Sequence, residues 1–146
     1  MLQIKRLFFV LVVSLAFFNM TCEEDDVVKV NCDNTVVVSE NDFNNLESAN
    51  FIIIDAEIEG DCLLLKIGAS GCDGSTWQYN LVDSGAIAES LPEQRYLKFQ
   101  LINEEMCEAY FNKTVSFNLS PLKIDNGVGK VVLHIEGLES SLTYTY

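Results

Sequence analysis

From residue 50 onward the chain alternates between apolar and polar side chains with a period of two. Successive side chains of a β-strand point to opposite faces, so this period predicts strands that are half buried in a core. Two other apolar runs, Thr35–Ser39 and Leu63–Ile67, alternate less cleanly and are predicted to be strands buried on both sides. The alternating strands are predicted over 52–58, 76–83, 95–102, 114–119, 131–136 and 142–146.

Turn-forming residues separate these strands. Glu59-Gly60-Asp61 and Asn126-Gly127 each suit a tight hairpin, because Gly and Asn adopt a left-handed backbone at low cost. Gly71–Ser75 is predicted to be a loop, and Asp42–Ser48 and Glu104–Tyr110 are predicted to form helical turns. About eight strands at this spacing predict an all-β domain over 31–146, a β-sandwich of about seven to nine antiparallel strands with immunoglobulin-like architecture. A small closed barrel is the alternative.

The first residues follow a different pattern, which predicts export. An apolar run over 7–18, interrupted only by Ser14, follows Lys5 and Arg6. This is the layout of a secretory signal, whereas a membrane-spanning helix would need about 20 apolar residues. The run ends at Cys22 without the pair of small residues that a general cleavage site requires. Cys22 instead resembles the acylated cysteine of bacterial lipoproteins, which implies a signal peptide over 1–21 and a lipid on Cys22.

Four carboxylates, Glu23–Asp26, follow this cysteine directly. Adjacent like charges repel one another, so residues 22–30 are predicted to be a lipidated cysteine and an extended acidic tether. The loose motif around Cys22 and the acids after it resemble those of Bacteroidota lipoproteins. In those lipoproteins, such acids look like an export tag for the outer face of the outer membrane. The resemblance implies a lipid-anchored protein of the outer membrane, displayed at the cell surface. A plain charged linker is the alternative for the acidic run.

Charge narrows the range of partners. The whole chain has a net charge of −13, and removing residues 1–21 takes away two bases and no acid, which leaves 22 acids against 7 bases and a net charge of −15. Such a surface repels nucleic-acid phosphates, so nucleic acid is not an expected partner. The expected partners are the membrane, through the lipid anchor, and an envelope protein or glycan.

Four cysteines remain once Cys22 is assigned to lipid: Cys32, Cys62, Cys72 and Cys107. An even number in an exported chain predicts two disulfides, and none of the spacings is the two-residue gap of a zinc site. Counting the strands from end to end places the first two cysteines at one end of the sandwich and the last two at the other. Because a disulfide requires Cα atoms within about 7 Å, the predicted pairs are Cys32–Cys62 and Cys72–Cys107.

Candidate catalytic residues are few. His134 is the only histidine, alternation turns it toward solvent, and neither a G-x-S-x-G nor an H-E-x-x-H pattern occurs. The stretches CDGS, with Asp73 and Ser75, and IDNG, with Asp125 and Asn126, are candidate calcium loops, but ordinary turns are the favoured interpretation. The prediction is therefore that the chain is not an enzyme and has no catalytic residue, metal or cofactor.

The aromatic residues fit a packed sandwich. Trp77 and Tyr79 share the inward face with Leu81, which predicts core packing rather than a platform for sugar stacking. The terminal SLTYTY predicts an edge strand, and such edges are natural sites for strand addition by a partner.

Three stretches, GCDGSTWQYNLVDSG, VSFNLSPLKI and VVLHIEG, resemble short flavobacterial lipoproteins of unassigned function. The resemblance extends over the mature domain and implies the location of the protein but no mechanism. The expected function is therefore that of a binding or structural module with an unknown ligand. The alternative is a small carboxylate-dependent hydrolase of the cell envelope.

Overall fold

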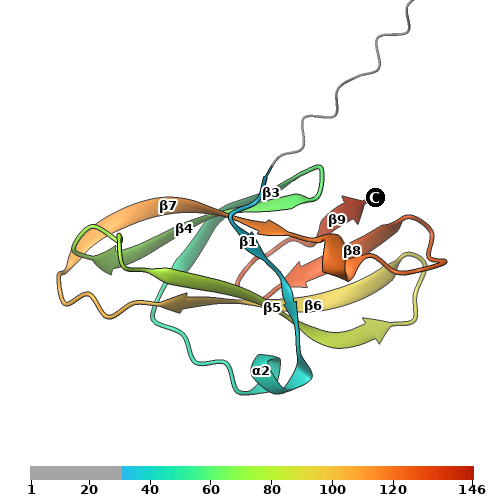
Figure 1. Cartoon of the computed structure of the whole chain (residues 1–146), viewed down its shortest axis with the longest axis horizontal. Coiled ribbons are helices and arrows are strands. Elements are labelled where there is room, and N and C mark those ends of the chain that lie inside the picture. Colours follow the sequence, from blue (N-terminus) through green and yellow to red (C-terminus); the bar gives the residue numbers. More distant parts are fainter. Residues whose placement is uncertain (1–30) are drawn as a thin grey trace, which may run out of the picture.

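The computed structural model describes residues 31–146, so the predicted signal peptide, Cys22 and the acidic tether lie outside the described residues. Within that range the chain forms a four-stranded sheet in the order β1-β7-β4-β3 and a five-stranded sheet in the order β2-β5-β6-β8-β9. The two sheets lie over one another (Figure 1). The predicted β-sandwich is confirmed.

From β3 onward each strand overlaps a predicted one, although β5 runs past the predicted 76–83 and β7 begins before the predicted 114–119. The strands are β1 (Asn34–Thr35), β2 (Val37–Val38), β3 (Ile52–Glu59), β4 (Cys62–Gly71), β5 (Gln78–Ala88), β6 (Glu93–Ile102), β7 (Ala109–Asn118), β8 (Lys130–Ile135) and β9 (Leu142–Thr145), with the short helices α2 (Glu40–Asn44) and η1 (Ser120–Leu122).

The core consists of the inward-facing side chains of both sheets. Trp77 and Leu81 are buried and Tyr79 packs against them, which confirms the inward face predicted for these residues. The other buried core residues are Val36, Leu63, Leu65, Ile67, Ala69, Leu97, Phe99, Leu101, Val115, Phe117, Leu119, Leu122, Val131, Leu133, Ile135 and Tyr144.

The first described segment, which contains β1 and β2, passes from one sheet to the other. β1 pairs in parallel with β7, and β2 pairs in parallel with β5 in the opposite sheet. Only Val36, between them, lies in the core, while Val37 and Val38 are 43% and 44% exposed. The prediction that Thr35–Ser39 is one strand buried on both sides is therefore wrong, because the chain changes sheets in the middle of this run.

Strand directions also differ from the prediction. β6 and β8 pair in parallel, as do the two pairs formed by the first strands, so the sandwich is mixed rather than wholly antiparallel. Asn126 does adopt a left-handed backbone, with φ 61°. Its turn connects β7 of one sheet to β8 of the other, so the predicted hairpin at Asn126-Gly127 is wrong.

Three local predictions are corrected as well. The predicted helical turn over 42–48 begins earlier, because Ser39 caps the helix by accepting the N–H of Asp42 at 3.2 Å. The predicted helical turn Glu104–Tyr110 is an extended loop as far as residue 108, held by the contacts described below. Leu63–Ile67 is not buried on both sides, since Lys66 is exposed.

No helix within residues 31–146 has the length and apolar character needed to cross a membrane.

Candidate binding site at the disulfide-closed loops

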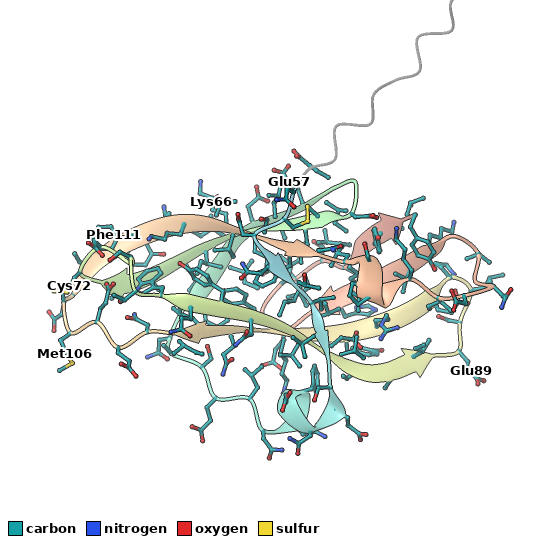
Figure 2. The ribbon with its side chains drawn as sticks, in the orientation of Figure 1. Glu57, Lys66, Cys72, Glu89, Met106 and Phe111 are labelled. Atoms are coloured by element: carbon teal, nitrogen blue, oxygen red, sulfur yellow. A yellow bond between two sulfur atoms is a disulfide. The ribbon has the colours of Figure 1, made fainter. Side chains whose placement is uncertain are left out.

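Two disulfides lie at opposite ends of β4. Cys32–Cys62 has a Cα–Cα distance of 5.7 Å, Cys72–Cys107 has one of 4.7 Å, and both pairings confirm the prediction from strand counting. β4 has ten residues, which at about 3.3 Å per residue separates its ends by roughly 30 Å. We call residues 71–77 and 103–108, which the second disulfide joins, the disulfide-closed loops. Cys72 and Met106 lie together at one tip of the molecule, and Glu89 lies near the opposite tip (Figure 2).

The carboxylate of Glu105 holds these two loops together. Its Oε2 accepts the backbone N–H groups of Cys72, Asp73 (3.2 Å) and Gly74 (3.0 Å). Its Oε1 accepts the hydroxyl of Thr76 at 2.9 Å. Desolvation raises the pKa of Glu105, but these hydrogen bonds together outweigh it and lower the pKa from 4.5 to about 2. The group is therefore an ionised carboxylate at every ordinary pH, and its ligands are main-chain amides of the facing loop.

Neighbouring residues pack closely around the Glu105 carboxylate. A Cβ placed on Gly71 would lie 2.4 Å from Glu105 Oε2 and 2.9 Å from the Trp77 ring, so only glycine fits there. Lys113 donates to the carbonyl of Gly74, and its Nζ lies 5.6 Å from the centroid of the Trp77 ring. Within the described residues, the buried Nε1 of Trp77 has no hydrogen-bond acceptor.

Asn103 orients the second loop. Its Oδ1 accepts the N–H of Glu105 at 2.9 Å, and its Nδ2 donates to the carbonyl of Ser70 at 2.7 Å. The sequence predicted a helical turn here. The segment is instead held as an extended loop by the contacts of Asn103, by the disulfide and by the hydrogen bonds to the Glu105 carboxylate. The loops are therefore ordered by polar contacts between segments that are distant in the sequence.

The surface of this tip combines a hollow with exposed apolar side chains. The hollow has a volume of about 440 Å³ and is lined by Thr76, Gln78, Ile102, Glu104 and Glu105. Met106 of the second loop is 94% exposed, and Tyr110, the second residue of β7, is 55% exposed. The Tyr110 ring lies over Gly68 of the neighbouring strand, since a Cβ on Gly68 would meet its hydroxyl at 1.8 Å.

The other residues that the sequence singled out have ordinary contacts. His134 stacks on Tyr96, with ring centroids 5.0 Å apart, and its Nε2 lies 2.7 Å from Gln94 Oε1. Asp73 Oδ1 accepts the N–H of Ser75 at 2.8 Å, which is the turn that the favoured interpretation expected. No group of three or more His, Cys, Asp or Glu side chains lies together as a metal site within 31–146. The other candidate calcium loop, with Asp125 and Asn126, is the left-handed turn before β8.

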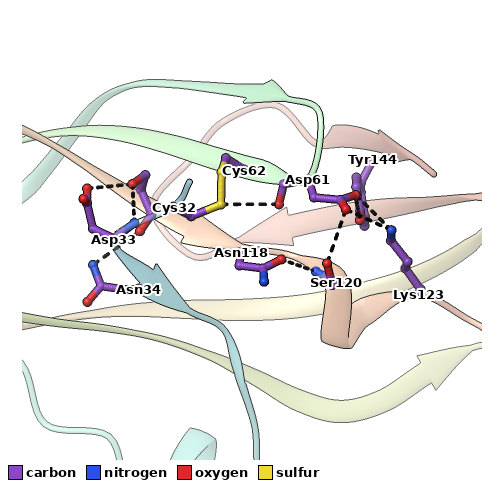
Figure 3. Close-up of a disulfide and its surroundings, with 10 residues drawn as sticks. Cys32, Asp33, Asn34, Asp61, Cys62, Asn118, Ser120, Lys123 and Tyr144 are labelled. Carbon is purple, nitrogen blue, oxygen red and sulfur yellow. Dashed lines mark hydrogen bonds and ion pairs between the residues drawn. A yellow bond between two sulfur atoms is a disulfide. The ribbon is translucent and has the colours of Figure 1, made fainter. Parts of the chain in front are cut away.

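A second polar cluster lies beside the other disulfide, and the sequence did not reveal it. Asp61, in the β3–β4 turn, accepts the hydroxyl of the buried Tyr144 and the ammonium of Lys123 at 3.0 Å (Figure 3). The hydrogen bonds from Tyr144 and Lys123 lower the pKa of Asp61. Burial, and then the bond to Asp61, raises the pKa of Tyr144. The cluster ties the turn of one sheet to the last strand of the other.

A buried ion pair was also missed. Arg95 donates through Nε and Nη2 to the two carboxylate oxygens of Asp83, at 3.0 and 2.7 Å. Asp83 is fully buried and Arg95 is 5% exposed. The sequence contained an indication of this pair, because Asp83 is in phase with inward-facing Leu81, and Arg95 is in phase with inward-facing Leu97.

No protein-family model and no curated protein sequence matches this chain. Among solved structures it is similar to a protein of unknown function (DUF1344) from Bacteroides vulgatus, with 14% identity and a TM-score of 0.52 over 77% of this chain and 55% of that one. It is also similar to a NigD-like immunity protein from Bacteroides caccae, with 9% identity and a TM-score of 0.57 over 77% of this chain and 63% of that one.

These similarities show the fold alone, and the chain matches only 55% and 63% of the length of the two proteins. Both proteins come from Bacteroides, which is consistent with the resemblance to Bacteroidota proteins of unassigned function.

Proposed function

We propose that this chain is an exported, lipid-anchored module of the outer membrane that binds an envelope partner through the disulfide-closed loops. The observation that carries the proposal is the ordered state of these loops around the Glu105 carboxylate. Binding by a loop that is already ordered avoids much of the entropy that a flexible loop loses. Met106 and Tyr110 would supply the apolar contacts, since exposed Met and aromatic side chains are enriched at protein interfaces.

The position of the loops fits an anchored protein. The proposed lipid on Cys22 would be attached ten residues before Cys32. Cys32 is bonded to the start of β4, whereas the loops lie at the end of that strand. The chain would therefore be tethered at one end of β4 and would present its binding loops at the other.

The carboxyl groups favour binding over hydrolysis. A glycosidase of the usual kind needs one carboxylic acid whose pKa is raised, so that it can donate a proton at neutral pH. Here the pKa of Glu105 is lowered to about 2, and hydrogen bonds also lower the pKa values of Asp61 and Asp73. These three groups accept hydrogen bonds as carboxylates and are poorly suited to act as general acids.

Site-specific photo-crosslinking in the cell envelope tests the proposed surface. A photoreactive residue placed at position 106 of the full chain should give a discrete crosslinked product, and the same residue at position 89, near the opposite tip, should not. Tyr110→Ser should reduce the yield at position 106, whereas Tyr96→Ser, which alters an exposed tyrosine of the other sheet, should not. Equal crosslinking at positions 89 and 106, or none at 106, would rule out the loops as the binding surface.

The anchor has a separate test. Cys22→Ala should release the protein from the membrane fraction or block its processing, whereas the Cys72→Ser/Cys107→Ser variant should remain in that fraction. Unchanged membrane retention of Cys22→Ala would remove the lipoprotein part of the proposal.

A further inference from the structure

One side of the sandwich has strand edges without a neighbour among residues 31–146. On the opposite side, β1 and β2 cross between the sheets and pair with both. β3 and β9 are the last strands of their sheets on this side, and they lie close to each other. β3 has eight residues and β9 has four, so β3 is the longer of the two edges.

The main chain of β3 has hydrogen-bonding groups directed away from the sheet. In an antiparallel pair, every second residue turns its N–H and C=O away from its partner strand. Ala56 is such a residue, because its N–H donates to the side chain of Asp55 at 2.9 Å rather than to Leu65 opposite. An added strand could replace this local contact with a main-chain hydrogen bond.

The outward side chains of β3 divide into two halves of different chemistry. Ile52 and Ile54 are 57% and 42% exposed, which is unusual on an edge strand, where charged residues normally discourage pairing. The register with β4 shifts between Ile53 and Asp55, and after this bulge Asp55, Glu57 and Glu59 are all exposed. The edge is therefore apolar in its first part and acidic in its second.

We propose that β3 is a docking edge for an extended, basic segment of a partner protein, which adds a strand to the four-stranded sheet. The segment would place lysine or arginine opposite Asp55–Glu59 and apolar side chains opposite Ile52–Ile54. Main-chain hydrogen bonds supply affinity in such strand addition, and alternate side chains supply specificity. The apolar half of this edge adjoins Tyr110, because Ile52 pairs with Gly68, over which the Tyr110 ring lies. The outward main chain of β3 is separate from the disulfide-closed loops, so the inference goes beyond the proposed function and does not depend on it.

A second copy of the chain fits this edge poorly. Antiparallel pairing of two β3 strands centred on Ala56 would place Asp55 opposite Glu57 of the other copy, and like charges directly opposite are destabilising. A shift by one residue would place Glu57 opposite Ile54 and Glu59 opposite Ile52, so each of these acids would face an apolar side chain instead of an opposite charge. The chain also has 22 acids against 9 bases, which favours a basic partner over a copy of itself.

Peptide binding to the full chain tests the edge directly. The probe is a labelled eight-residue peptide with lysines at alternate positions in one half and valines at alternate positions in the other. Fluorescence anisotropy at low salt should detect its binding, whereas a peptide with glutamates in place of the lysines should not bind. Glu57→Lys/Glu59→Lys should weaken binding by about tenfold or more, since rim charges act chiefly through electrostatic attraction. Glu47→Lys/Glu89→Lys, which changes two exposed acids away from the edge, should weaken it much less.

A main-chain variant separates strand pairing from simple charge attraction. Ala56→Pro removes the outward N–H while leaving the ladder with β4 in place, because this N–H does not take part in that ladder. It should abolish binding of the lysine peptide, whereas Ala56→Val, which keeps the N–H, should not. Equal binding of the lysine and glutamate peptides, or unchanged binding to folded Ala56→Pro, would overturn the proposal. A dimer in sedimentation that dissociates in Ala56→Pro would assign the edge to a second copy instead.

Discussion

The ion pair between Asp83 and Arg95 allows the energetics of this sandwich to be tested at one point. Both side chains lie inside the sandwich, with two hydrogen bonds between them at 2.7 and 3.0 Å. Asp83 also accepts the N–H of Gly85 at 2.7 Å. We expect that removing one partner destabilises the fold strongly and that removing both destabilises it far less than the sum of the single changes.

The magnitude follows from burial. Removing one member of a buried pair leaves an uncompensated charge and costs about 3–5 kcal/mol. Domains of this size unfold with about 5–15 kcal/mol in total, so the loss is a large share of the stability. The 116 residues of 31–146 give an unfolding entropy of roughly 0.24 kcal/mol/K, so the melting temperature should fall by about 12–20 °C.

Urea unfolding of the purified full chain, with its disulfides intact, measures this. Asp83→Asn and Arg95→Met should each lower the free energy of unfolding by about 3–5 kcal/mol. Asn can still accept the Gly85 N–H, so the double variant should lose only about 1–3 kcal/mol, which reflects its unpaired amide donors. A single variant that loses less than about 1 kcal/mol, or a double variant that loses the full sum, would refute this account of the pair.

The remaining predictions concern the two disulfide-bonded ends. Cys72→Ser/Cys107→Ser removes a crosslink with a sequence separation of 35, so the free energy of unfolding in urea should fall by about 3.8 kcal/mol. A change in the m-value would show that the unfolded state had changed as well. The pKa of Glu105 is lowered in the folded chain, so its contribution to stability is complete above pH 4.5 and is lost as the pH falls toward 2. Melting temperatures across this range should therefore fall less steeply for Glu105→Gln than for the unaltered chain. Tyr144→Phe removes the hydroxyl that donates to Asp61 and should cost about 1 kcal/mol, because Lys123 still pairs with that carboxylate.

The parts of the fold that the sequence predicted correctly depend on local periodicity. Alternation identified β3 and β5 to β9, because each buries one face and a half-buried strand must alternate, whereas β4 was identified only as an apolar run. Strand counting then predicted both disulfides. It needs only the number of strands that run between the two ends of the sandwich from one cysteine to the next, and it does not need to know which strands are neighbours. The bounds of the strands were less accurate, since β5 extends to Ala88 and β7 begins at Ala109.

The parts that could not be predicted depend on contacts between distant segments. Nothing within Thr35–Ser39 indicates that the chain changes sheets after Val36, since that depends on the positions of β7 and β5. The parallel pairing of β6 with β8 has the same origin. The Asp83–Arg95 pair is different, because each residue alternates in step with inward-facing apolar residues of its strand. The sequence therefore indicated two buried side chains of opposite charge, and buried charges are normally paired.

The candidate site was the hardest feature to predict, because its central contact joins a side chain to main-chain amides. Any carboxylate in the 103–108 loop could have pointed to solvent, and the backbone N–H groups of 72–74 carry no sequence information. Cys72 and Cys107 supply the missing constraint, since they bring Glu105 opposite the amide of Cys72 itself. The polar groups of the loops are then largely satisfied by one another, which leaves Met106, Tyr110 and the adjacent hollow to face outward. If these loops recognise a partner, its identity is therefore determined by shape and apolar contact at this tip rather than by the carboxylate that orders it.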